Sequence, residues 1–152
     1  MEIIARELTV DLYNCKTAKI SDPSLTEETL RQNLAASAFH VLKSETAALS
    51  DDHFAMILLL QEGHVTLHTY ASLRYVAADI FLCAEDAEPE RLFKALRNFF
   101  KPDKIKTTHL KRGDFGTISD MKPKIKTRVA PLRRINNAGA KVVRLLARRK
   151  RK

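Results

Sequence analysis

The sequence lacks an apolar run long enough to cross a bilayer as a helix, which takes about 18 residues or more. It also lacks the basic start of a secretory signal, because the acidic residue Glu2 directly follows Met1. These absences argue against a membrane-spanning protein and against a secreted one. We therefore expect a cytoplasmic protein.

Cysteine is scarce, with only Cys15 and Cys83 among 152 residues. Two cysteines this far apart provide neither a disulfide framework nor the close ligand spacing of a zinc site. We expect both to be free thiols, with Cys15 as a small core residue.

Acidic residues are missing from the C-terminal part of the chain. Residues 121–152 hold 13 Lys and Arg and no Asp or Glu, whereas residues 1–120 hold 14 Lys and Arg against 18 acids. The net charge of +9 therefore comes from the last part and says nothing about the partners of the preceding residues. The basic part also contains no aromatic residue, which argues against base stacking and leaves only sequence-independent contacts with nucleic acid.

The first half of the chain alternates between strand and helix patterns, and its length suits one domain with an appendage. Residues 3–13 have the period of two of a half-buried strand. Ser24 and Glu27 form a capping box that predicts a helix over about residues 25–38. A short strand at 40–44 and a continuous apolar strand at 54–60, buried on both faces, should follow.

Residues 61–70 and 75–83 predict a β-hairpin with a four-residue turn. Pairing Tyr70 near Tyr75 places Glu62 opposite Cys83 and His68 opposite Ala77. Side chains alternate between the two faces of a strand. The apolar face then carries Val65, Leu67, Val76, Ala78, Ile80 and Leu82, and the other carries Glu62, His64, Thr66, His68, Tyr70, Asp79 and Cys83.

A second helix should begin at Pro89 and end near Lys101, before a last strand over residues 104–111. The resulting order β-α-β-β-β-α-β predicts an α+β two-layer sandwich, a mainly antiparallel sheet with two helices on one face. We expect this domain to cover residues 1–113. Residues 114–152 should form a basic, largely irregular tail, with helical spacing only over residues 137–146.

The motifs of the hairpin, residues 62–70 and 77–83, resemble those of the prokaryotic S-adenosylmethionine decarboxylases of spermidine synthesis. That family has Glu-Ser-His-x-(Ser/Thr)-x-His-Thr, followed by a hydrophobic strand that ends in Cys. The similarity covers about residues 4–112 and implies a homodimer with the α+β sandwich described above. It also implies a pyruvoyl group, which these enzymes make by cutting their own backbone.

The pyruvoyl group requires a serine, and this chain has Gly63 at that position, directly after Glu62. The serine hydroxyl attacks the preceding carbonyl to form an ester, and β-elimination followed by hydrolysis leaves the ketone. The ketone then forms a Schiff base with the substrate and accepts electrons when CO₂ leaves. Glycine has no hydroxyl and nothing on Cα to eliminate, so we expect no pyruvoyl cofactor.

Other family positions are partly retained. The resemblance assigns His68 to the processing histidine and Cys83 to the catalytic proton donor. A processing serine is replaced by Ala55, and the segment Trp-Pro-Glu, whose glutamate contacts substrate, reads Tyr70-Ala71-Ser72. The aromatic residue expected to stack on adenine reads Leu49. Several departures together favour a natural non-processing homologue over the engineered loss of one serine.

The two hairpin histidines do not predict a metal site. His64 and His68 would lie ~13 Å apart on one strand, whereas zinc ligands lie ~2 Å from one ion. His68 and Cys83 could form a base and a nucleophile, but the register separates them by about five pair positions. An inherited structural pair is the simpler interpretation.

Three functions remain open from the sequence. The first is a non-catalytic binding or regulatory protein, with a polyamine, an S-adenosylmethionine-like ligand or an active paralogue as its partner. The second is an active decarboxylase-like enzyme, or another reaction that uses His68 and Cys83. The third is an adaptor whose tail binds nucleic acid or an anionic membrane. The candidate cations for that contact are Lys122, Lys124, Lys126, Arg128, Arg133, Arg134, Arg148, Arg149, Lys150, Arg151 and Lys152.

Overall fold

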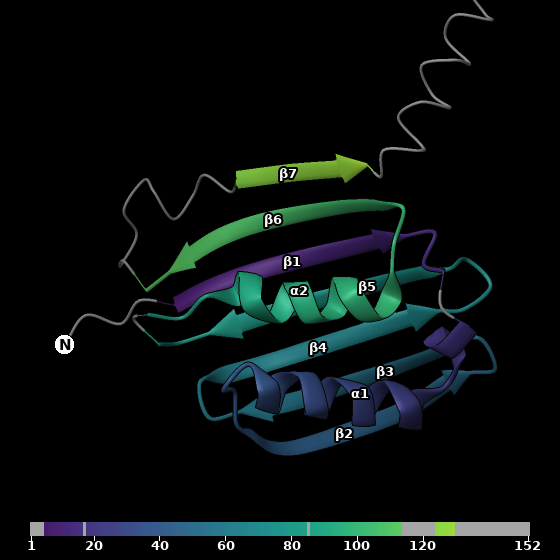
Figure 1. The fold of residues 1–152 in the computed structure, drawn as a ribbon, viewed down its shortest axis with the longest axis horizontal. Coiled ribbons are helices and arrows are strands. Elements are labelled where there is room, and N and C mark those ends of the chain that lie inside the picture. The colour runs from purple at the N-terminus through teal and green to yellow at the C-terminus, as the bar shows by residue number, and fades with distance from the viewer. Residues whose placement is uncertain (1–4, 17, 85, 114–123, 130–152) are drawn as a thin grey trace, which may run out of the picture.

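The computed structural model describes residues 5–16, 18–84, 86–113 and 124–129, which form one sheet with two helices on one of its faces (Figure 1). The strands are β1 (Ala5–Tyr13), β2 (Val41–Ser50), β3 (His53–Leu60), β4 (Gly63–Tyr70), β5 (Tyr75–Leu82), β6 (Lys104–Arg112) and β7 (Lys124–Val129). Their order is β2-β3-β4-β5-β1-β6-β7, and each neighbouring pair is antiparallel. The predicted α+β two-layer sandwich is therefore confirmed.

The helical elements are η1 (Ala18–Ser21), α1 (Pro23–Ala36) and α2 (Pro89–Phe100). α1 lies over β2 and β3, and α2 lies over β1 and β5 (Figure 1). The core fills the space between the helices and the sheet. Its fully buried side chains include Leu8, Leu12, Leu30, Leu34, Leu58, Leu67, Val76, Ile80, Leu96 and Phe100.

α1 begins two residues earlier than predicted, and its cap is a different residue. Asp22 Oδ1 accepts a hydrogen bond from the backbone N–H of Leu25 at 2.9 Å, so Asp22 is the N-cap. Pro23 suits the first helical position because that position needs no N–H partner. The capping box assigned to Ser24 is therefore wrong, since Ser24 already lies inside the helix.

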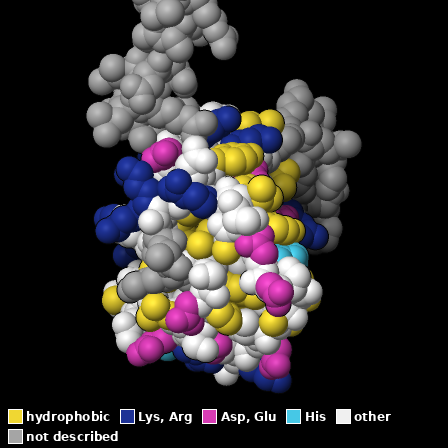
Figure 2. Space-filling view, turned by 90° about the vertical axis from the view of Figure 1, so that its right-hand side faces the viewer, with side chains coloured by type: hydrophobic (Ala, Val, Ile, Leu, Met, Phe, Trp, Pro, Cys, Tyr) yellow, Lys and Arg dark blue, Asp and Glu magenta, His cyan; other side chains and the backbone are white. Residues whose placement is uncertain are grey.

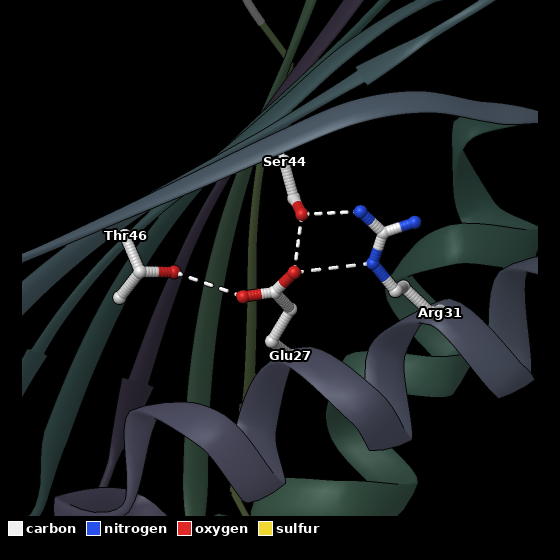
Figure 3. A network of polar contacts seen from close by, with 4 residues as sticks. All are labelled: Glu27, Arg31, Ser44 and Thr46. Atoms are coloured by element: carbon white, nitrogen blue, oxygen red, sulfur yellow. Dashed lines mark hydrogen bonds and ion pairs between the residues drawn. The ribbon is translucent and has the colours of Figure 1, made fainter.

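Four side chains hold α1 against the edge strand β2 (Figure 3). The Ser44 hydroxyl donates to Glu27 and accepts from Arg31. Arg31 Nε also lies 3.1 Å from Glu27 Oε1, and Thr46 Oγ1 donates to Glu27 Oε2 at 3.3 Å. The Ser44 hydrogen bond is the main reason that the pKa of Glu27 is lowered, against the opposing effect of burial.

The strands between the helices differ from the prediction. Four strands lie there, as the predicted ranges require, although the order β-α-β-β-β-α-β counts only three, and β2 extends to Ser50 rather than ending at Ser44. β3 is not buried on both faces: Ile57 is 44% exposed and Leu59 is 46% exposed, whereas Met56 and Leu58 are buried. An apolar run cannot reveal which of its faces receives a helix, and here the helices cover only one.

The tail was predicted to be irregular, yet residues 124–129 form β7 and pair with β6. An edge strand leaves unpaired N–H and C=O groups that another segment can satisfy. Pro123 precedes the strand, so it removes no donor from the ladder. The helix predicted at residues 137–146 lies outside the described residues.

The hairpin has the predicted register. Tyr70 pairs with Tyr75, and His68 pairs with Ala77. The Cys83 N–H donates to the carbonyl of Glu62 at 2.7 Å, which places these two residues opposite each other. Within the described residues, no helix has the length and apolar content needed to cross a membrane.

Candidate functional site

The hairpin side chains singled out in the sequence lie on the face of the sheet opposite the helices, which we call the open face. This face also receives alternate residues of β3 and β1. Figure 2 views the molecule from the right-hand end of Figure 1, with a group of Lys and Arg side chains at the left, others at the top, right and bottom, and acidic and hydrophobic ones between them. The two ends of the open face carry different groups.

One end, which we call the histidine end, is formed by His53, His68 and Tyr70. His53 Nε2 lies 3.0 Å from His68 Nδ1, so one ring donates and the other accepts. The ring of Tyr70 stacks on that of His53, with centroids 4.2 Å apart. β3 pairing brings Ala55 directly opposite His68. The histidine end can therefore bind planar or cationic groups and relay a proton between imidazoles.

The aromatic row continues across the sheet from β4 to β1. Tyr70 stacks on Tyr75 at 5.8 Å, and Tyr75 lies 5.3 Å from Tyr13. The Tyr75 hydroxyl donates to Asp11 Oδ1 at 2.5 Å. Burial, together with this bond and the negative charge of Asp11, raises the pKa of Tyr75. Lys104 Nζ lies 5.2 Å above the Tyr13 ring, so the row already holds one cation on a ring face.

Together with Tyr70, Ser72 and Leu49 stand at the positions where the family resemblance places ligand contacts. Ser72 instead binds Asp52 within the protein, because its N–H and hydroxyl each donate to that carboxylate at 2.5 Å. Leu49 is 54% exposed on β2, near the same end as His53. Tyr70 is the member of this set that belongs to the aromatic row.

The other end, which we call the glycine end, is formed by Glu62, Gly63 and Cys83. Cys83 is exposed and has a free thiol. Glu62 Oε1 lies 3.5 Å from His40 Nδ1, while Glu62 Oε2 is buried and has no hydrogen-bond partner. Cys15, by contrast, is buried, and burial raises the pKa of its thiol to about 12, as expected for a core cysteine.

Gly63 leaves no room for a side chain. A Cβ built on Gly63 would lie 1.9 Å from the carbonyl oxygen of Phe81 and 3.0 Å from the Cα of Leu82. Both atoms belong to the backbone of β5, so neither can turn away as a side chain would. The residues present therefore do not fit a pyruvoyl group at this position. Gly63 lacks the hydroxyl, and β5 occupies the space in which a serine side chain would start.

The two ends are far apart in one chain. His68 and Cys83 are separated by six pair positions of the hairpin, one more than predicted, which corresponds to ~20 Å at 3.3 Å per residue. They cannot act on one bond within a single chain. His64 lies between them and stacks on Phe81, over which Arg112 also lies at 5.1 Å.

No metal site is formed by the described residues, since none of their His, Cys, Asp and Glu side chains gather in groups of three or more that could hold an ion. Of the tail cations, Lys124, Lys126 and Arg128 lie on β7. The others lie outside the described residues, namely Lys122, Arg133, Arg134, Arg148, Arg149, Lys150, Arg151 and Lys152.

Sequence reasoning missed His53, Tyr13 and Asp11. The signal for His53 was present, because a tight turn at Gln61-Glu62 pairs β3 with β4 and sets Ala55 opposite His68. His53 then lies opposite Tyr70. Tyr13 and Asp11 could not be placed, because nothing local in the sequence shows that β1 pairs with β5.

Comparison with known proteins adds the family context. A family model described as S-adenosylmethionine decarboxylase matches residues 6–113. An S-adenosylmethionine decarboxylase proenzyme of Methanococcus vannielii is 29% identical over 113 residues, covering 74% of this chain and 93% of the relative. One of Thermotoga petrophila is 25% identical over 118 residues, covering 78% and 91%.

A solved structure shares the fold. The crystal structure of the adenosylmethionine decarboxylase from Aquifex aeolicus matches with a TM-score of 0.67 at 18% sequence identity. The match covers 74% of this chain and 93% of that one.

Proposed function

Because the chain belongs to the S-adenosylmethionine decarboxylase family, we propose that it is a non-catalytic member, a binding or regulatory protein linked to S-adenosylmethionine or polyamine metabolism. The observation that carries this proposal is the backbone at Gly63. The chain lacks the serine hydroxyl, and the carbonyl of Phe81 stands 1.9 Å from where a Cβ would be. Both the absent hydroxyl and the lack of space for a Cβ at residue 63 favour a chain that forms no pyruvoyl group.

The open face supports binding of a cationic ligand. Ring faces attract cations, most strongly when water is partly excluded. The row from His53 to Tyr13 contains four rings, of which Tyr13 already carries Lys104, and Asp11 supplies a carboxylate beside it. A sulfonium such as that of S-adenosylmethionine, or a polyamine, has this charge.

A second chain is part of the proposal, and we propose that it covers the open face. Ile57 and Leu59 are exposed there, in addition to the aromatic row. A two-fold partner packed face to face could bring the histidine end of one chain toward the glycine end of the other, which a single chain keeps ~20 Å apart. An active paralogue with the same fold could take the same place as a second copy.

Decarboxylation and binding can be measured on the same preparation. We expect no CO₂ release from carboxyl-labelled S-adenosylmethionine, because the electron sink is missing. We also expect S-adenosylmethionine or spermidine to raise the melting temperature, since a ligand at 100 times its Kd adds about 2.7 kcal/mol of stability. Tyr70→Ala should reduce this shift, whereas Leu73→Ala, an exposed position in the following turn, should not.

CO₂ release would overturn the non-catalytic assignment. The absence of a thermal shift with either ligand class would instead remove the proposed small-molecule ligands and leave a protein partner.

A further inference from the structure

A second concave site lies away from the open face, where β6 and β7 meet the first turn of α2. The pocket has a volume of about 430 Å³, within the range of small-molecule sites, roughly 300–1,000 Å³. Four cations line it, namely Arg6, Lys111, Lys124 and Lys126. Its other lining residues include His109 and Glu90, the latter on α2.

The sheet register explains why the β7 cations gather here. Thr107 pairs with Lys126, Ile105 pairs with Arg128, and residues paired across two strands share a face. Ile105 and Thr107 are buried on the helix side. The β7 cations therefore continue that side beyond the cover of α2, spaced by ~7 Å along the strand.

His109 lies in the pocket between a carboxylate and two lysines. Its Nδ1 lies 3.5 Å from Glu90 Oε1, an arrangement that favours the charged imidazole. Burial, followed by the charge of Lys126 and then that of Lys124, outweighs Glu90 and lowers the pKa of His109. The lowered pKa favours the neutral imidazole, and the four cations of the pocket outnumber its two acids, Glu7 and Glu90.

On the β1 side of the pocket, the side chains of Arg6 and Glu7 are each held by a partner within the protein. The Arg6 guanidinium donates to the carbonyl of Ala87 at 2.9 Å, just before α2 begins, which leaves its other N–H groups available. Glu7, the second acid in the lining, is paired with Arg112 at 3.4 Å. Glu90 is then the acid that remains near the cations.

We propose that this pocket binds a small molecule that bears phosphate groups. Phosphate suits a site with one guanidinium and several lysines, because Arg binds its oxygens in pairs and Lys adds point charges. A nucleic-acid backbone fits less well, because the cations line a hollow and Glu90 stands inside it. The site does not depend on the loss of the pyruvoyl chemistry, since it occupies the opposite face of the sheet.

The pocket combines two parts of the chain. Arg6, Glu90 and His109 lie within residues 6–113, which the decarboxylase family model matches, whereas Lys124 and Lys126 lie beyond them. Two of the four lining cations thus lie on β7, beyond the residues that the family model matches.

Titration of the full-length protein with inorganic pyrophosphate, followed by NMR of the His109 ring, tests the proposal. His109 can be assigned by comparison with His109→Gln. We expect a saturable change at His109 and an upward shift of its pKa, because a bound anion offsets the field of Lys126 and Lys124. Lys126→Glu should weaken binding at least tenfold, and Lys126→Gln should weaken it less.

Lys106→Glu is the matched control, because Lys106 lies on the adjacent strand β6 and points to the open face. It should leave pyrophosphate binding within about twofold of the unmodified chain. Equal weakening by Lys106→Glu and Lys126→Glu would overturn the proposal in favour of a diffuse charge effect. If pyrophosphate leaves the His109 signal unchanged, the proposal is overturned. Binding of the same protein to anionic vesicles would then point to contacts made elsewhere in the basic tail.

Discussion

At the scale of single residues, Gly63 decides what chemistry the hairpin can support. Its neighbours Glu62 and Cys83 keep the identities that the family resemblance assigns to them, and His68 is also retained. A missing hydroxyl alone could be restored by one substitution. The space for a Cβ at residue 63 could not be restored by one substitution, because the backbone of β5 occupies it and would have to move.

Restoring the serine should therefore fail. We predict that Gly63→Ser yields no cleavage after Glu62 and lowers the stability by about 1–3 kcal/mol, the usual cost of adding atoms to occupied space. Electrophoresis detects cleavage, and urea unfolding measures the stability.

Gly63→Ala is the control for that substitution. It adds the same Cβ without the hydroxyl, so it should cost a similar amount of stability. A Gly63→Ser chain that cleaves itself, or that is as stable as the parent, would show that the space at residue 63 opens readily.

At the scale of the elements, the sequence predicted most of what alternation and amphipathic spacing encode. The hairpin register, α2 and β6 match the structure closely because each is determined by local pattern. β3 was misread because an apolar run does not show which of its faces a helix will cover. β7 was missed because its basic residues, preceded by Pro123, resemble a solvated tail, although its pairing partner β6 is the element directly before it.

The site shows the same division. The sequence identified His68, Cys83 and Gly63 through residue types and spacing within the hairpin. It could not identify His53 or Tyr13, because their proximity to Tyr70 and Tyr75 depends on which strands pair with the hairpin.

The contact between α1 and β2 should make stability depend on pH through Glu27. A carboxyl whose pKa is lowered on folding stabilises the protein above its unfolded pKa, near 4.5, and loses this contribution as the pH falls through the folded value. We predict that Glu27→Gln costs about 1 kcal/mol at pH 7, and that this difference shrinks below pH ~4.5. Thermal unfolding from pH 3 to 7 measures both.

Glu28→Gln is the matched control, since Glu28 contacts Gln32 on the exposed side of α1. It should change stability little at either pH. A Glu27→Gln penalty that stays constant down to pH 3 would contradict the role given to the carboxylate charge.

At the scale of the whole molecule, the sheet is covered by helices on one face and carries the aromatic row on the other. We predict a homodimer that buries the open face, so sedimentation should give twice the chain mass of 17.2 kDa. Ile57→Asp should shift the equilibrium toward monomer, because it places a charge on that face. Leu73→Asp, a more exposed residue in the β4–β5 turn, should not.

A monomer at all concentrations would contradict this arrangement, as would a dimer indifferent to Ile57→Asp. Either result would leave the open face for a different partner, such as a paralogue, and would not affect the conclusion about Gly63.

The central claim concerns the whole chain: it stays uncut and forms no ketone. Intact-mass spectrometry of the purified full-length protein, with and without a ketone-trapping hydrazine, tests this directly. We predict a single species at the full chain mass of 17.2 kDa with no adduct. Two fragments from a break between Glu62 and Gly63, or a hydrazone on any fragment, would contradict the account.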